Sequence, residues 1–172
     1  MLKIDYELLK NGNVKVGEQL NPLIVNSTQG MINTSEIEGN IILFSYKEDF
    51  FYISELEILE IKKNEKEFKK LNTNIIFMTT GNLLSHYAWI DSIKMRTGIE
   101  ITFPIVEDKI GENCRKYGMY SQEKKQILNK TIIVNKQKNI EAIIEYPTEI
   151  PRNIYEVIRI LNFLQNLSYE LN

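Results

Sequence analysis

Short apolar runs rich in β-branched and aromatic residues recur along the chain, and segments with helical spacing lie between them. Three of these runs span Asn40 to Tyr46, Asn74 to Met78 and Thr131 to Val134, and a fourth candidate strand spans Ile140 to Tyr146. Runs of this length and composition are typical of strands buried on both faces of a sheet. The alternation therefore predicts a layered α/β domain with a central sheet.

Helical periodicity fills the intervals between these strands. It predicts helices over Ser54 to Leu71, Leu83 to Arg96 and Lys109 to Tyr117. A last helix is predicted after Pro151, and we expect its apolar face to cover the sheet. That face would contain Ile154, Val157, Ile158, Leu161, Leu164 and Gln165.

The composition favours one soluble, well-packed domain over residues 1–172. The chain has 172 residues, of which 43% are hydrophobic and 26% charged, and it contains no repeat or flexible linker that would mark a second domain. Its formal net charge is -2, and no basic stripe could neutralise successive phosphates, so we expect no nucleic acid partner. We also expect no membrane span or secretory signal, and a cytoplasmic location by default.

This sequence has too few cysteine and histidine residues for a metal site built from them or for an intramolecular disulfide. Its only cysteine is Cys114 and its only histidine is His86, which excludes an intramolecular disulfide, a cysteine metal cage and a histidine cluster. We therefore expect no metal or cofactor. Cys114 is expected to be a structural, partly buried thiol. The alternative is a thiol activated by Arg115 and Lys116, although neighbouring residues on a helix point in different directions.

One segment of the sequence is similar to a known active site. Residues 44–58, FSYKEDFFYISELEI, resemble the segment of peroxiredoxins in which a strand with an aromatic end leads through a P-x-x-x-T-x-x-C motif into a helix. Tyr46, Asp49, Phe50 and Glu57 set the register of this match.

Further blocks match the same family in the same order, and six ordered blocks are hard to obtain by chance. The resemblance implies a thioredoxin-like fold with peroxiredoxin additions, a central mixed sheet flanked by helices, and a homodimer or higher homo-oligomer. It also gives His86 a packing and hydrogen-bonding role. The matching residues are Val16, Gly17 and Pro22; Ser85, His86, Ala88 and Trp89; Phe103, Pro104 and Asp108; Tyr117 and Gly118; and Arg152, Glu156, Arg159 and Gln165.

Four positions depart from the family pattern, and they are the ones that carry its chemistry. In the aligned motif Lys47, Phe51 and Ser54 replace the proline, threonine and cysteine, and Asn129 stands at the place of the catalytic arginine. The family's reaction implies a thiolate that attacks the O–O bond and becomes a sulfenic acid. A serine hydroxyl stays protonated near neutrality and has no such oxidation chemistry.

A structural role accounts for Ser54 without any catalysis. The sequence Ser54-Glu-Leu-Glu57 fits a capping box, in which the serine caps the helix and Glu57 reaches back to its backbone. A serine hydrolase would need a base beside Ser54, and His86 is assigned to packing. We therefore favour capping over nucleophilic catalysis.

The aromatic and lysine-rich segments have simple interpretations. We expect Phe50, Phe51 and Tyr52, with Tyr87 and Trp89, to be core or subunit-contact residues rather than a stacking platform for bases. Lysines and glutamates alternate after Ser54, which is typical of a solvated helix face with ion pairs between successive turns.

Two functions from different classes remain open at this point. In the first, the chain is a degenerate peroxiredoxin that acts as a structural or interaction module, and it is one domain of a longer polypeptide or a self-associating unit. In the second, it is a thiol-dependent peroxidase in which Ser54 is an engineered replacement of the catalytic cysteine. Lys47, Phe51 and Asn129 count against the second, because one replacement leaves three others unexplained.

Overall fold

A four-stranded sheet lies at the centre of the molecule, with the strand order β4-β3-β7-β8. It consists of β3 (Asn40–Ser45), β4 (Thr73–Met78), β7 (Asn129–Val134) and β8 (Ile140–Tyr146). β3 runs parallel to β4 and antiparallel to β7, which pairs antiparallel with β8. The sheet is thus mixed, and all four predicted strands are present to within two residues at each end.

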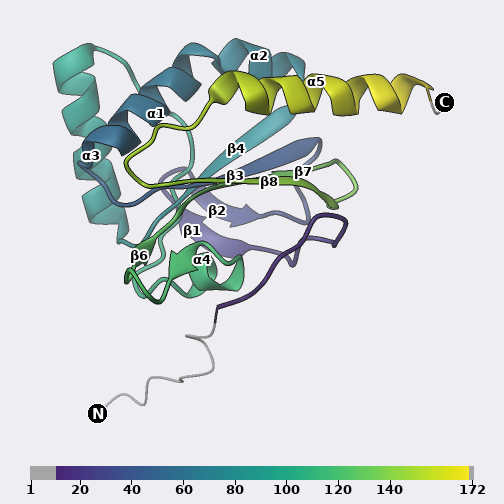
Figure 1. Ribbon diagram of the computed structural model, residues 1–172. Coiled ribbons are helices and arrows are strands. Elements are labelled where there is room, and N and C mark those ends of the chain that lie inside the picture. Colours follow the sequence, from purple (N-terminus) through teal and green to yellow (C-terminus); the bar gives the residue numbers. More distant parts are fainter. Residues whose placement is uncertain (1–10, 171–172) are drawn as a thin grey trace.

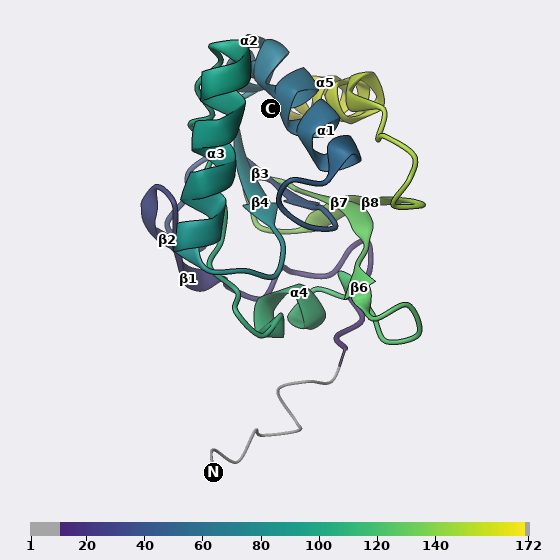
Figure 2. The ribbon, with the colours of Figure 1, turned by 90° about the vertical axis from the view of Figure 1, so that its left-hand side faces the viewer.

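Four helices cover one face of this sheet: α1 (Tyr52–Lys63), α2 (Glu65–Lys70), α3 (Leu83–Thr97) and α5 (Ile154–Glu170). In Figure 1, α1, α2 and α5 lie above the strands, and Figure 2 shows α3 standing beside them. The core under these helices joins β-strand residues to helix residues. It includes Ile42, Phe44, Ile75, Phe77, Ile58, Ile61, Trp89, Ile93, Val157 and Leu161.

A second core fills the opposite face of the sheet. It is covered by the hairpin β1 (Ile24–Ser27) and β2 (Gly30–Asn33), by the short helix α4 (Glu112–Lys116), and by the small ribbon β5 (Tyr120–Ser121) and β6 (Gln126–Ile127). Cys114 and Tyr117 belong to this core. Because both faces are covered, the central strands are buried almost throughout, which accounts for their continuous apolar runs.

Two helix predictions require correction. The segment Ser54 to Leu71 is not one helix, because α1 ends at Lys63 and α2 begins at Glu65 after a break at Asn64. Leu56 is exposed, although its spacing from Leu59 would place both on one apolar face, and the buried stripe of α1 contains Ser54, Glu57, Ile58 and Ile61.

The predicted helix Lys109 to Tyr117 is shorter than expected. It forms only over Glu112–Lys116, because Gly111 before it has a left-handed φ of 72°. Leu83 to Arg96 is confirmed as α3. The C-terminal helix is confirmed as α5, with Ile154, Val157 and Leu161 buried.

The computed structural model describes residues 11–170, with the side chains of 168–170 left out. The expectation that Met1 to Lys10 is not a secretory signal lies outside the described residues. Within the described part of the chain, no helix is long and apolar enough to span a bilayer. Among the same residues, no group of three or more His, Cys, Asp or Glu side chains could hold a metal ion.

Candidate functional site

The N-terminal end of α1 carries the segment that resembles the peroxiredoxin motif. The chain leaves β3, passes Phe50 in a left-handed conformation with φ of 62°, and enters the helix through Phe51 as N-cap. Ser54 lies in the first turn of α1 and is 4% exposed. Phe50 and Tyr52 are 58% and 69% exposed, so neither is a core residue, and a role in subunit contact stays a prediction for both.

The capping box predicted for Ser54 is not formed. The helix begins at Tyr52, two residues before Ser54, and the N-cap residue Phe51 makes no side-chain capping bond. Ser54 is therefore inside the helix. Glu57 does not reach back along α1, because it hydrogen-bonds to a distant part of the chain.

Lys47 and Phe51 contact each other at the surface of this segment. The Lys47 ammonium lies 4.6 Å from the centroid of the Phe51 ring, which is a cation–π geometry. The Lys47 carbonyl accepts a 3.2 Å hydrogen bond from the Thr79 hydroxyl, so the backbone here is tied to the end of β4. Two of the four substituted positions thus form one pair.

Asn129, Glu57 and Arg152 form a second, buried cluster. The Asn129 Nδ2 donates to Glu57 Oε1 at 2.9 Å, and the Arg152 backbone N–H donates to the same oxygen at 2.7 Å. Arg152 Nη2 donates to Asn129 Oδ1. All three residues are at most 5% exposed. Asn129 is therefore a link between a buried carboxylate and a buried guanidinium.

The Arg152 guanidinium connects several elements. Its Nη1 donates to Thr131 Oγ1 at 3.0 Å, and its Nη2 donates to the Ser45 carbonyl at 2.5 Å. Its Cζ atom lies 4.8 Å from the centroid of the Phe44 ring. Nε lies 3.1 Å from Glu57 Oε1 but makes no hydrogen bond. Burial lowers the pKa of Arg152, and the Glu57 carboxylate opposes that shift.

Sequence reasoning found the four substituted positions but missed Glu57 and Arg152 as members of the site. The structure brings Asn129 into contact with both of them, and it pairs Lys47 with Phe51. The Ser54 hydroxyl makes no hydrogen bond with any residue in the range 11–170. A signal did exist, since Glu57 and Arg152 both lie in the matching motifs, but nothing in the sequence pairs one with the other.

His86 and Asp49 form a third cluster under the same segment. His86 Nδ1 lies 2.8 Å from Asp49 Oδ2, and its Nε2 lies 3.1 Å from the Val106 carbonyl oxygen. The Ser85 hydroxyl and the Tyr46 hydroxyl also donate to the Asp49 carboxylate. The packing and hydrogen-bonding role predicted for His86 is confirmed. Its fully buried ring fixes the loop that precedes α1 to α3.

Burial alone would raise the pKa of Asp49, but the hydrogen bonds that it accepts and the proximity of His86 outweigh burial and hold that pKa below its usual value. The carboxylate is therefore kept ionised by its surroundings. This cluster orients the segment before α1 and has no opening to solvent at His86.

A protein family model also matches this chain. The model described as the AhpC/TSA family matches residues 16–143, which is most of the chain. The chain belongs to the peroxiredoxin family. A protein named Peroxiredoxin from Thermotoga petrophila is 36% identical over 153 residues, which cover 87% of this chain and 71% of that protein.

Solved structures support the thioredoxin-like peroxiredoxin fold. The yeast mitochondrial 1-Cys peroxiredoxin superposes with a TM-score of 0.84 at 24% identity, covering 92% of this chain and 79% of that one. A cysteine-to-serine mutant of the Peroxiredoxin 6 of Arenicola marina gives a TM-score of 0.80 at 24% identity, covering 89% of this chain and 74% of that one. Likeness at this level of identity concerns the fold.

The single thiol of this peroxiredoxin chain lies in surroundings that would not activate it as a nucleophile. Cys114 lies in α4 and is fully buried, and its backbone N–H donates to Asp108 Oδ2 at 2.8 Å. Burial raises the pKa of the Cys114 thiol well above its usual value, and Asp108 adds to the shift more than Arg115 opposes it. The predicted burial of this thiol is confirmed, and the burial is full rather than partial.

Proposed function

We propose that this chain is a catalytically degenerate peroxiredoxin domain, spanning residues 1–172, that acts as a structural or interaction module. The observation that carries the proposal is the combination of Ser54 at the peroxidatic position with Asn129 at the arginine position. Peroxide reduction needs a thiolate at the first and a cationic donor at the second, and neither side chain can supply its group.

The buried contacts support a structural role for the remaining site. Asn129 hydrogen-bonds to Glu57 through its amide nitrogen and to Arg152 through its amide oxygen, and both bonds lie inside the protein. Its polar atoms are thus committed to the fold rather than to a substrate. Lys47 is likewise engaged with Phe51, whose ring offers no hydrogen-bond donor for a peroxide oxygen.

The second candidate is a thiol-dependent peroxidase in which Ser54 stands in for the catalytic cysteine. One observation favours it: the guanidinium of Arg152 lies against Asn129, so a positive charge is present in the cluster that contains the arginine position. The Arenicola marina protein named above also keeps the fold with a cysteine-to-serine mutation. Reading the codon at position 54 in the natural gene tests this candidate directly.

The experiment that tests the proposal is peroxide consumption by the purified chain with dithiothreitol or thioredoxin as reductant. We expect no turnover above the buffer rate. Cys114→Ala serves as the control, since turnover that disappears in this variant would place the chemistry at the buried thiol and contradict the proposal. Fast turnover by Ser54→Cys alone would instead favour the second candidate.

Self-association is part of the same proposal. The family resemblance implies a homodimer or a higher homo-oligomer, and a module without catalysis would keep its contact surfaces. Other domains of a longer polypeptide are the alternative partners. Light scattering during size-exclusion chromatography, over a range of protein concentrations, measures the mass of the particle and separates a stable dimer from a monomer.

A further inference from the structure

The outer edge of β4 is only partly paired. The carbonyl of Asn72, just before β4, accepts from the Asn40 N–H, and the Met78 carbonyl accepts from the Tyr46 N–H, so the even-numbered residues bond to β3. The N–H and C=O of Phe77 point the other way, to Pro104 and Val106. Backbone groups alternate sides along a strand, so those of Thr73 and Ile75 also face outward.

The segment that pairs with Phe77 does not reach Thr73 and Ile75. The parallel bridge to it is limited to Phe77 and Ile105, and β4 has no neighbour in the sheet other than β3. In the described part of the chain, neither the outward N–H nor the outward C=O of Ile75 has a backbone partner. An unpaired row of this kind is a template for one more strand.

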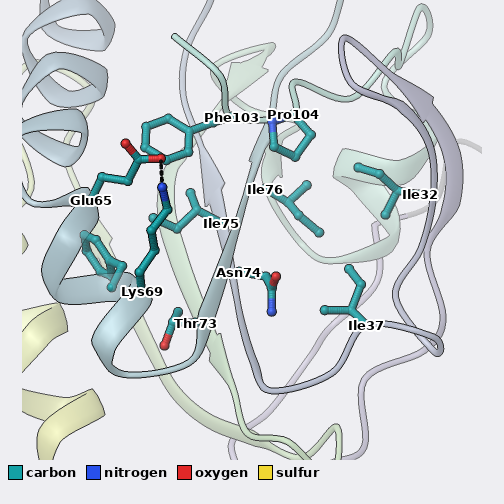
Figure 3. Close-up of a pocket in the computed structure, with 11 residues that line it drawn as sticks. Ile32, Ile37, Glu65, Lys69, Thr73, Asn74, Ile75, Ile76, Phe103 and Pro104 are labelled. Atoms are coloured by element: carbon teal, nitrogen blue, oxygen red, sulfur yellow. Dashed lines mark ion pairs between the residues drawn. The ribbon is translucent and has the colours of Figure 1, made fainter.

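A pocket of about 260 Å³ opens at this unpaired stretch. Figure 3 shows α2 with Glu65 and Lys69 on one side and Ile32 and Ile37 on the other, with β4 between them. The side chains of Thr73 and Ile75 belong to the helix face of the sheet, and those of Asn74 and Ile76 to the opposite face. Since residues from both faces line it, the pocket wraps around the strand edge.

The chemistry of the pocket fits an extended backbone with apolar side chains. Phe103 borders the pocket on one side of the strand edge and Ile32 and Ile37 border it on the other, with Ile37 the most exposed of the three. Consecutive side chains of an extended peptide point to opposite faces, so successive residues would reach the two apolar walls in turn. Pro104 closes one end of the pocket, which limits the occupant to a few residues.

Three charged side chains lie together on the helix side of the pocket. Glu65 is bonded to two lysines, with its oxygens 2.7 Å from Lys62 Nζ and 3.0 Å from Lys69 Nζ. One carboxylate shared by two ammonium groups leaves one net positive charge. Lys69 is 71% exposed, so its ammonium group can reach a further carboxylate.

We propose that a short extended peptide segment of a partner protein, apolar and carrying an acidic residue, adds as a strand to the β4 edge at Thr73 and Ile75. This inference rests on the interaction role proposed above and names its surface and its class of partner. It requires no peroxide, thiol or reductant. Strand addition of this kind obtains its affinity from backbone hydrogen bonds and its preference from alternate side-chain pockets.

Amide hydrogen exchange measured by NMR tests the proposal on the full chain, with the synthetic peptide acetyl-Glu-Val-Ile-Val-Glu-amide as probe. We expect saturating peptide to slow exchange at Ile75 about tenfold, as one new backbone hydrogen bond would. The N–H of Ile76, which already faces β3, should not change. Two peptides methylated on alternate amides separate edge pairing from loose apolar contact, because methylation of one set should abolish binding and methylation of the other should be tolerated.

A matched pair of variants tests the charge preference. Lys69 and Lys70 are 71% and 70% exposed in the same turn of α2, but only Lys69 lines the pocket. Lys69→Glu should weaken peptide binding up to about fivefold, the range of an exposed ion pair, and Lys70→Glu should leave it unchanged.

Three results would overturn the proposal. They are the absence of any peptide-dependent protection at Ile75 with millimolar peptide, equal binding by both methylated peptides, and protection at Ile75 that rises with protein concentration alone, which would mean a second copy. A peroxide assay on the same sample keeps the two proposals apart, since peptide binding does not depend on turnover.

Discussion

Glu57 and Arg152 form a buried ion pair that ties α1 to the segment immediately before α5, with Arg152 Nε 3.1 Å from Glu57 Oε1. The backbone N–H of Arg152 donates to the same carboxylate oxygen. The pair thus fixes both a side chain and the chain path over the sheet. Asn129 completes it from β7.

Glu57→Gln should destabilise the protein by about 3 to 5 kcal/mol, because it leaves the Arg152 cation buried without a counter-charge. Urea unfolding followed by circular dichroism measures this loss. Glu55→Gln is the matched control. It breaks the Glu55–Arg96 pair, whose side chains are 20% and 51% exposed, and should cost less than about 1 kcal/mol. Equal losses in the two variants would contradict a stabilising role for the buried pair.

Ser54→Cys alone should restore little peroxidase activity. The new thiol would lie in the first turn of α1, but Phe51 and Asn129 would still offer neither a hydroxyl nor a charge to the peroxide. Loss of one such donor typically costs about a hundredfold or more in rate. Stopped-flow peroxide consumption measures this, with the chain as given as the blank. A rate close to that of the triple variant Phe51→Thr, Ser54→Cys, Asn129→Arg would show that the supporting residues matter little.

Asp49→Asn should lower stability at neutral pH, and the difference from the parent chain should shrink in acid. The folded-state pKa of Asp49 is lowered, so its carboxylate stabilises the fold above the unfolded-state pKa of about 4. That contribution is lost as the pH falls through the folded-state pKa. Unfolding free energies measured between neutrality and acid check the trend. A difference that is constant across this range would contradict the role of the ionised form.

The Cys114 thiol should not react with a thiol reagent such as Ellman's reagent until the protein unfolds. Its folded-state pKa is raised, so this group contributes stability below the unfolded-state pKa of about 8.5, and that contribution is lost as the pH rises through the folded-state pKa. Labelling in native buffer and in urea gives the comparison. Fast labelling of the folded chain would mean that Cys114 is accessible.

The sheet was predictable because its strands are buried on both faces. Their apolar runs carry that information locally, and β8 has the predicted bounds Ile140 to Tyr146. The break at Asn64 was not predictable, since the residues around it favour a helix on both sides. The hairpin of β1 and β2 was also missed, because its strands have four residues each and lie half-exposed.

The site was predictable only in part, for a reason of sequence distance. The motif identifies Lys47, Phe51 and Ser54 because they lie on one continuous segment. The bond between Glu57 and the backbone of Arg152 joins residues 95 positions apart, and no local pattern reports such a pairing. The capping box at Ser54 was wrong for the opposite reason, because a local motif was satisfied in the sequence while the helix began two residues earlier.

The position of β3 in the sheet has a consequence for the speed of folding. β3 pairs with β4, which follows it after a crossover that contains α1 and α2, and β7 pairs with its close neighbour β8. The contact between β3 and β7, in which Leu43 lies opposite Ile132, instead joins distant parts of the chain. Closing that long loop carries the largest entropic cost in the sheet. Two locally formed strand pairs are therefore expected to dock along one seam in the slowest step of folding.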